Sequence, residues 1–254
     1  MVTGPGDALS PGFFCLWDVV MKTVVIIPAG GVGRRMGNGI LKQYLPLAGI
    51  PIIVHTLQAF QHSPVVDEIF LVVPEGDIPE IRQEIVARYG LSKVALVLPG
   101  GRERQDSVRN ALQHVSDEHG IVVVHDGVRP FISGDLISRA VAAAREFGAI
   151  TAGMPVKDTV KEVTAKGWVK KTITRQGLWL TQTPQAFHRP IIIAAYEKAS
   201  ADGFYGTDDA SLVERTGIAV RMIPGESDNI KVTTPEDLHL GHLIIRSSSE
   251  EMGG

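Results

Sequence analysis

The chain has 254 residues, long enough for one large α/β domain, and its hydrophobic content of 44% with 21% charged residues is that of an ordinary globular protein. A formal net charge of -3 argues against nucleic acid or an anionic membrane surface as the main partner. Cys15 is the only cysteine, which excludes an intrachain disulfide and favours a reducing, cytoplasmic setting. No apolar stretch approaches the roughly 18 residues that a membrane-spanning helix needs.

The beginning of the chain reads as a poor signal peptide, because it lacks a basic segment and Asp18 interrupts its short apolar patch. We expect residues 1–20 to be a disordered extension that takes no part in the fold. Residues 21–246 are expected to form a single domain, and residues 247–254 a disordered tail.

Short apolar segments rich in β-branched residues predict strands, and segments with helical spacing of apolar residues lie between them. The predicted strands are residues 23–27, 68–73, 93–98, 121–125, 149–155 and 219–223, and the predicted helices are 51–61, 78–89, 106–115 and 135–147. This alternation indicates an α/β fold of three layers, in which a mostly parallel, mixed sheet has helices on both faces. Ligands of such sheets bind beyond the carboxyl ends of the strands, so the loops that follow the strands form the candidate site.

The loop after the first strand, residues 30–37, is rich in glycine and carries two arginines, and Lys42 follows closely. Glycine lets main-chain N–H groups approach an anion, and Arg and Lys supply the charge that a polyphosphate demands. The dinucleotide fingerprint fails because Met36 replaces its third glycine, and the P-loop pattern is absent. A nucleoside triphosphate is therefore the favoured ligand. The alternative is a strand-to-helix turn with incidental surface arginines.

Two further loops follow predicted strands. The segment 99–108 is a second glycine turn that opens a helix, where Ser107 could read a base or a phosphate, or could belong to an ordinary capped helix start. Asp126 stands at the end of the strand 121–125, with Arg129 three residues later. A carboxylate there can hold Mg²⁺ and an arginine can hold a substrate phosphate, the alternative being a structural salt bridge.

The segment 156–183 interrupts the alternation of strands and helices. Residues 157–163 alternate polar and apolar side chains, residues 165–167 form a turn, and residues 168–173 alternate again. This pattern predicts a β-hairpin arm that projects from the main sheet. Because a two-stranded hairpin is marginal in water, we expect the arm to pack against a second subunit.

Two polar clusters lie near the end of the chain. Residues 207–211 open a helix with a threonine and two carboxylates, a pattern more typical of a helix cap than of a site. Asn229 and Lys231 precede a Thr-Pro pair that begins the last predicted helix. The zinc motif H-E-x-x-H and the serine-hydrolase elbow G-x-S-x-G are both missing, which disfavours those two classes of enzyme.

Together the clusters resemble the 2-C-methyl-D-erythritol 4-phosphate cytidylyltransferases of non-mevalonate isoprenoid synthesis, from about residue 22 to about residue 243. Each motif alone is weak, but their order and number are highly specific. They are AGGVGRRM at 29–36, KQY at 42–44, GGRER at 100–104, HDGVRP at 125–130, TPQAF at 183–187, TDDAS at 207–211 and DNIKVT at 228–233.

The resemblance implies a Rossmann-type, GT-A-like nucleotidyltransferase fold and a reaction that joins CTP to methylerythritol phosphate and releases pyrophosphate, with Mg²⁺. It implies that the nucleotide is bound by Ala29, Gly30, Gly31, Gly33, Gly101, Ser107 and Asp126, and that the catalytic residues are Arg35, Lys42 and Lys231. It assigns the substrate to Asp126, Arg129, Thr159, Arg175, Thr207 and Lys231, and the metal to Asp126. Arg175 would reach from the arm into the other subunit's site, which implies a homodimer.

One departure from the family pattern is Leu41, where the family usually has proline, so the loop before Lys42 is expected to be less rigid. The closest alternative is a ribitol 5-phosphate cytidylyltransferase, which shares the fold, CTP and most motifs and differs in the alcohol pocket. A pyrophosphorylase for another base fits the arm and the 101–107 pattern less well. A catalytically silent nucleotidyltransferase-like regulatory domain would be expected to lose charges such as Arg35, Lys42 and Asp126, which are present.

Overall fold

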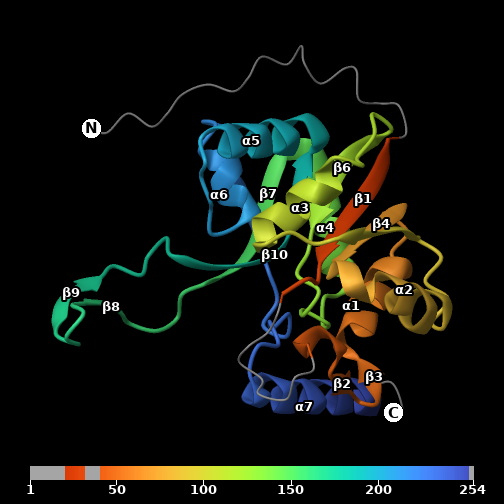
Figure 1. The fold of residues 1–254 in the computed structure, drawn as a ribbon. Helices are drawn as coiled ribbons and strands as arrows, with labels where there is room; N and C mark the ends of the chain where they lie inside the picture. The colour runs from red at the N-terminus through yellow and green to blue at the C-terminus, as the bar shows by residue number, and fades with distance from the viewer. Residues whose placement is uncertain (1–20, 32–40, 252–254) are drawn as a thin grey trace.

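A seven-stranded sheet forms the centre of the computed structural model, which describes residues 21–31 and 41–251 (Figure 1). The expected extension at 1–20 lies outside the described residues. The strand order is β11-β7-β10-β6-β1-β4-β5. Their bounds are Lys22–Pro28 for β1, Glu68–Val73 for β4, Val94–Pro99 for β5, His119–Val124 for β6, Ala149–Pro155 for β7, Trp179–His188 for β10 and Arg221–Pro224 for β11.

The sheet is mixed because β10 runs antiparallel to both of its neighbours, β6 and β7. The other pairs, β1 with β4, β1 with β6, β4 with β5 and β11 with β7, are parallel. The predicted mostly parallel, mixed sheet is thus confirmed. Strand β10 was not predicted, since Gln182, Thr183 and Gln185 interrupt its apolar residues and Pro184 lies among them.

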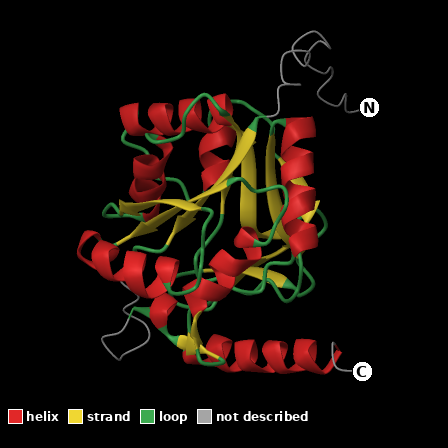
Figure 2. Cartoon of the chain, turned by 90° about the vertical axis from the view of Figure 1, so that its right-hand side faces the viewer, coloured by secondary structure: helices red, strands yellow, loops and turns green. Residues whose placement is uncertain are grey.

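Helices cover both faces of the sheet, which makes three layers (Figure 2). Alternate residues of β1 explain this, because Val25 and Ile27 join one apolar core while Val24 and Ile26 join the other. The first core includes α1 (Ile52–Gln61), η5 (Ile81–Ala87) and α4 (Gly134–Phe147). The second includes α3 (Arg104–Leu112), α5 (Arg189–Ala201) and α6 (Asp209–Glu214).

Several predicted boundaries shift in the structure. The predicted helix 78–89 begins as α2 (Ile78–Glu80) and continues as the wider π-type turn η5. Helix α3 starts two residues before the predicted position, because the Asp106 carboxylate accepts a hydrogen bond from the Glu103 N–H at 3.1 Å and caps the first turn. The predicted strand 219–223 starts only at Arg221, where pairing with β7 begins.

A small substructure closes one end of the molecule below the sheet in Figure 1. It contains η3 (Lys42–Tyr44), the short strands β2 (Pro46–Leu47) and β3 (Ile50–Pro51), and α7 (Pro235–Glu251). Leu238 and Ile245 of α7 pack against an apolar cluster that includes Leu47. Because α7 continues to Glu251, the first part of the tail expected at 247–254 is helical; extending a formed helix costs far less than starting one.

The hairpin arm is present, with β8 (Val160–Val163) antiparallel to β9 (Val169–Ile173), and it projects away from the body (Figure 1). Gly167 takes a φ of +83° in its turn, a backbone conformation that favours glycine. Among the helices of the described residues, none is long and apolar enough to cross a membrane.

Candidate active site

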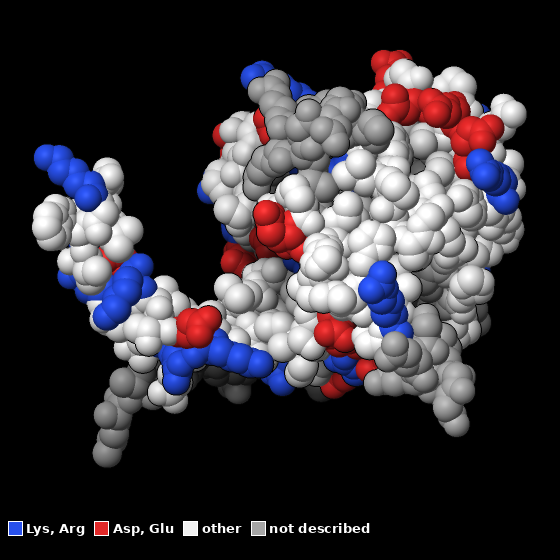
Figure 3. Space-filling view, turned by 90° about the horizontal axis from the view of Figure 1, so that it is seen from below, with Lys and Arg blue, Asp and Glu red and all other residues white. Residues whose placement is uncertain are grey.

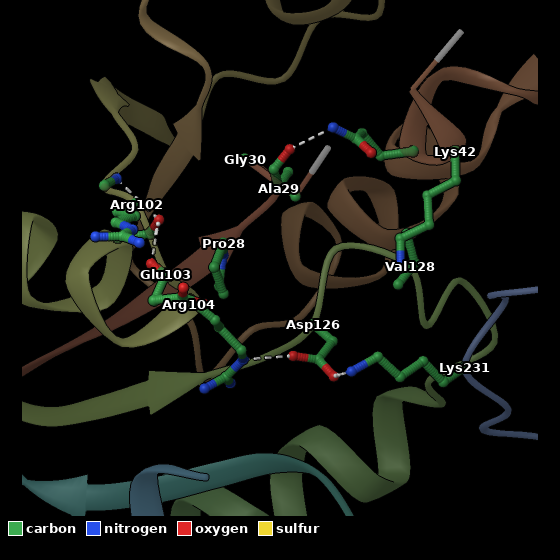
Figure 4. A pocket seen from close by; sticks show the side chains of 14 residues that line it. Pro28, Ala29, Gly30, Lys42, Arg102, Glu103, Arg104, Asp126, Val128 and Lys231 are labelled. Atoms are coloured by element: carbon green, nitrogen blue, oxygen red, sulfur yellow. Dashed lines mark hydrogen bonds and ion pairs between the residues drawn. The ribbon is translucent and has the colours of Figure 1, made fainter. Parts of the chain in front are cut away.

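A first cleft of about 320 Å³ opens beyond the carboxyl ends of the parallel strands (Figure 4). Its walls come from the end of β1, from the turn between β5 and α3, from the loop after β6, from η3 and from the loop before α7. The residues of this cleft include Ala29, Gly30, Gly31, Lys42, Gln43, Gly101, Arg102, Glu103, Arg104, Ser107, Asp126, Val128 and Lys231.

Lys42 is brought to the cleft by its neighbour Gln43, which is buried. The Gln43 Nε2 donates a hydrogen bond to the Ala29 carbonyl at 2.5 Å, so η3 is fixed against the end of β1. In Figure 4 the Lys42 side chain extends from η3 toward Val128. This anchoring places an ammonium group on the same cleft as the glycine-rich end of β1.

The second glycine turn has a closely fitted geometry. Gly101 is required there, because an added Cβ would lie 2.3 Å from the Asp106 Cβ. The Gly101 N–H donates to the Ser107 hydroxyl at 3.1 Å, and that hydroxyl donates to the Glu103 carbonyl at 3.2 Å. The capped helix start expected at this position is therefore present, and the Ser107 hydroxyl also lines the cleft.

A second cleft of about 270 Å³ adjoins the first. Arg104, Asp126 and Lys231 line both clefts, so the two spaces meet at these three charged side chains. The remaining residues of the second cleft are Arg129, Thr181, Gln182, Thr183, Gln185, Thr207 and Asp208. A ligand in one cleft can therefore lie next to a ligand in the other across the same charged group.

The Asp126 carboxylate at this junction is held by cations. Its Oδ1 accepts from the Arg104 Nε at 2.9 Å, and its Oδ2 pairs with the Lys231 Nζ at 2.7 Å (Figure 4). Its Oδ2 also lies 3.9 Å from the Arg129 Nε. Burial alone would raise the pKa of Asp126, but Arg104, Lys231 and Arg129 hold it well below its usual range. Asp126 is therefore ionised, and the cations around it outnumber it.

Arg129 is nearly buried beside the second cleft. Its Nη1 donates to the Asn229 carbonyl at 2.6 Å, which ties the loop after β6 to the loop before α7. Its Nε is buried without a hydrogen-bond partner in the described part of the chain. This leaves a donor of Arg129 available at the edge of the junction.

His125, which the sequence analysis did not single out by role, orients the Asp126 loop from beneath. Its Nε2 lies 3.1 Å from the Arg129 carbonyl, which can only accept, so Nε2 carries the proton and Nδ1 is the acceptor. The Thr183 hydroxyl lies 3.2 Å from that Nδ1 and accepts from the Asp126 N–H at 3.1 Å. Burial lowers the pKa of His125 to about 3, so the ring is neutral near pH 7.

The structure thus brings most of the sequence-predicted residues to the two joined clefts. These are Ala29, Gly30, Gly31, Lys42, Gly101, Ser107, Asp126, Arg129, Thr207 and Lys231. Thr159 and Arg175 instead lie on the exposed arm, where the Arg175 Nη1 donates to the Lys157 carbonyl. Gly33 and Arg35 lie outside the described residues.

Three polar partners of the site were not predicted from the sequence. Arg104 belonged to a quoted motif but received no role, although an arginine in a glycine turn is a usable signal. Asp209 pairs with Arg104 and was interpreted only as part of a helix cap, a role that Asp208 fills by accepting from the Ser211 N–H at 2.9 Å. Gln185 of β10 bonds Asp208 and the Ala210 N–H, and no local pattern in the sequence indicates it.

Comparison with known families gives a consistent result. The profile of the 2-C-methyl-D-erythritol 4-phosphate cytidylyltransferase family matches residues 23–247. A protein of that name from Syntrophus aciditrophicus is 52% identical over 225 residues, which is 89% of this chain and 96% of the relative. Another from Geobacter metallireducens is 48% identical over 229 residues, covering 89% of this chain and 98% of the relative.

Solved structures agree with the sequence comparison. A 4-diphosphocytidyl-2C-methyl-D-erythritol synthase from Anaerococcus prevotii superposes with a TM-score of 0.78 at 32% identity, covering 89% of this chain and 96% of that one. A 2-C-methyl-D-erythritol 4-phosphate cytidylyltransferase from Thermus thermophilus gives a TM-score of 0.74 at 31% identity, covering 89% and 100%. The range matched by the family profile, residues 23–247, includes all the residues that line the two clefts.

Proposed function

We propose that this chain, which belongs to the 2-C-methyl-D-erythritol 4-phosphate cytidylyltransferase family, transfers the cytidylyl group of CTP to 2-C-methyl-D-erythritol 4-phosphate. The products are 4-diphosphocytidyl-2-C-methyl-D-erythritol and pyrophosphate, in isoprenoid synthesis by the non-mevalonate pathway. The observation that supports this most strongly is the pair of clefts that meet at Arg104, Asp126 and Lys231. A group-transfer enzyme needs two sites whose ligands touch at the reacting atoms.

CTP occupies the first cleft in this proposal. The main chain at Gly30 and Gly31 approaches the phosphates, and Lys42, Gly33 and Arg35 belong to the same triphosphate-binding loop region. Cytosine lies at Gly101 and Ser107, where a fixed hydroxyl and main-chain groups can read the edge of a base. Ala29, which follows β1, also lines this nucleotide cleft.

Methylerythritol phosphate occupies the second cleft. Arg129, Thr207 and Lys231 offer donors to its phosphate and hydroxyl groups, and Asp126 accepts hydrogen bonds from the alcohol. The Arg129 Nε, which has no hydrogen-bond partner in the described part of the chain, supports an anionic or hydroxylated ligand there. Thr159 belongs to the same substrate side, and Arg175 joins it from the arm of a second subunit.

The chemistry requires alignment and charge neutralisation. A phosphate oxygen of the substrate attacks the α-phosphorus of CTP, the bond to the bridging oxygen breaks, and pyrophosphate leaves in line. A phosphate monoester is already a nucleophile, so neither a protein base nor a covalent protein intermediate is needed. Lys42, Arg35 and Lys231 neutralise the charge that builds on the phosphoryl oxygens and on the leaving group.

The residues present are compatible with a divalent cation, which we take to be Mg²⁺. Within residues 21–31 and 41–251 no group of three His, Cys, Asp or Glu side chains could form a metal cage. Mg²⁺ commonly binds through one or two carboxylates together with substrate phosphates, and Asp126 is an ionised carboxylate on the nucleotide cleft. Asp126 would hold the cation together with the phosphates of CTP, and the cation would supply positive charge beside the phosphoryl oxygens.

The arm supports a homodimer. Its large apolar side chains are exposed, among them Trp168 at 75%, Leu180 at 64% and Val169 at 60%. Figure 3 shows Lys and Arg side chains gathered along it, and Lys161, Lys166 and Arg175 are all exposed. A large exposed apolar surface is typical of a protein–protein interface, and basic side chains are typical of a phosphate-binding site. A second copy of the chain, with Arg175 contributed in trans, satisfies both.

The test is pyrophosphate release from CTP with Mg²⁺ and either methylerythritol phosphate or ribitol 5-phosphate, assayed side by side. We expect release that depends on methylerythritol phosphate and a much lower kcat/KM with the ribitol compound. Preference for ribitol 5-phosphate would favour the alternative cytidylyltransferase. Absence of release with both alcohols would favour the catalytically silent domain.

A further inference from the structure

Arg104 divides one edge of its guanidinium group between two carboxylates. Its Nε donates to the Asp126 Oδ1 at 2.9 Å, and its Nη2 donates to the Asp209 Oδ2 at 2.8 Å. The Nε and Nη2 hydrogens point in the same direction, so this edge ordinarily grips both oxygens of a single carboxylate. In this chain Asp209 takes one of the two donors.

Asp209 cannot act by touching a ligand. Its side chain is fully buried, and in the described part of the chain it lines neither cleft. Its other oxygen, Oδ1, accepts from the Tyr196 hydroxyl on α5 at 2.5 Å. Because Asp208 caps α6, the cap gives no reason for a second carboxylate at this position. A buried carboxylate is costly unless it is paired, so a function for it is to be sought in its partners.

Because Arg104 donates to two different carboxylates, it occupies only one of the two oxygens of Asp126. With one Arg104 donor on Oδ1, the Asp126 Oδ2 remains with the Lys231 ammonium at 2.7 Å. If Asp209 lost its charge, the Nη2 of Arg104 would be free to close a two-donor pair on Asp126. Arg104 would then compete with Lys231 for Oδ2, and Lys231 would lose the contact that fixes it between the clefts.

We propose that Asp209 is a positioning residue, which holds one donor of Arg104 and thereby reserves the second oxygen of Asp126 for Lys231. Tyr196 assists by fixing the orientation of the Asp209 carboxylate. The inference rests on the proposed function, in which Lys231 neutralises charge beside the substrate phosphate. It extends the site from the two clefts into the layer of α5 and α6.

The main test is Asp209→Asn, which keeps the shape of the side chain, removes its charge and replaces one of its two acceptor oxygens with an N–H donor. We expect the KM for methylerythritol phosphate to rise about tenfold and kcat to fall by a similar factor, with the KM for CTP changed less than about twofold. A general loss of structure would not separate the two substrates in this way. Ser133→Ala, which removes the cap of α4 at a side chain that lines neither cleft, is the control for lost stability and should leave both KM values unchanged.

A double-mutant cycle with Arg104→Gln shows whether Asp209 acts through Arg104. In the Arg104→Gln background, Asp209→Asn should change kcat/KM by less than about twofold, because the partner through which it acts is gone. Multiplicative losses, or equal changes in the two KM values, would overturn the proposal. Wild-type turnover is measured in the same assay, so a failure of the proposed function would show as an inactive wild type.

Tyr196→Phe provides an independent variant if Asp209→Asn does not fold. It keeps both charges and removes only the donor on the Asp209 Oδ1. We expect the KM for methylerythritol phosphate to rise about two- to fivefold with the KM for CTP unchanged. A wild-type value for both constants would contradict the role assigned to the buried pair.

Discussion

Replacing His125 with asparagine should make the free energy of unfolding depend less steeply on pH below about pH 6.5. His125 is fully buried, and burial lowers its pKa from 6.5 to about 3. Between these values the unfolded chain binds a proton on this residue and the folded chain does not. The stability that depends on the neutral ring is therefore complete above about pH 6.5, and it is lost progressively as the pH falls toward 3.

The size of the effect follows from the same two values. Each pH unit inside the window changes the free energy of unfolding by about 1.4 kcal/mol, so lowering the pH from 7.5 to 4.5 should cost about 3 kcal/mol through this residue. For a chain of this size that loss lowers Tm by about 6–12 °C. His125→Asn removes the proton-binding group, and this part of the pH dependence should disappear with it.

The assay is thermal and urea unfolding of the wild type and of His125→Asn at pH 7.5, 6.5, 5.5 and 4.5. The variant also loses hydrogen bonds to the Arg129 carbonyl and the Thr183 hydroxyl, so the test is the slope with pH rather than the value at any one pH. Ser133→Ala loses a helix cap but keeps His125, and its slope should match the wild type. Parallel curves for the wild type and His125→Asn would refute the reasoning.

Three further predictions concern the proposed site. Lys42→Ala and Arg35→Ala should each lower kcat by about 10²-fold or more with unchanged Tm, measured by pyrophosphate release; near-normal turnover in both would remove their assigned roles. Leu41 has a φ of -66°, the angle that proline imposes, so Leu41→Pro should retain activity and raise the free energy of unfolding in urea by about 0.4–1 kcal/mol; a loss of stability would show that the loop needs more freedom. Mixing Arg175→Ala with Lys231→Ala subunits should restore up to about a quarter of wild-type activity, because half of the dimers would then contain one complete site; no recovery would exclude the contribution in trans.

The sequence could predict those parts of the site in which the chemistry lies close to a strand end. Gly30, Gly101 and Asp126 each follow an apolar, β-branched segment, and parallel strands bring their carboxyl ends to one edge. The hairpin was predictable because polar and apolar residues mix on both sides of a glycine turn within residues 157–173. These signals are local, so one sequence is enough to detect them.

The remaining features depend on long-range contacts that leave no local pattern. Strand β10 lies between β6 and β7 although it has no continuous run of apolar residues. Its polar residues Thr183 and Gln185 form hydrogen bonds around the site instead of extending the apolar core. From the sequence alone Asp209 is a second carboxylate at a helix start, and only the fold shows that Arg104 of α3 pairs with it. Likewise, the sequence shows His125 only as a polar residue at a strand end, and its contacts with Thr183 and the Arg129 carbonyl appear only in the fold.

The proposed function requires that the first cleft receive CTP beside the junction of Arg104, Asp126 and Lys231. A calorimetric titration of the wild-type protein with CTP in the presence of magnesium tests it most directly. We expect saturable binding of one CTP per subunit, weakened in Lys42→Ala. If the folded protein took up no CTP at any concentration tested, the account of this site would be contradicted.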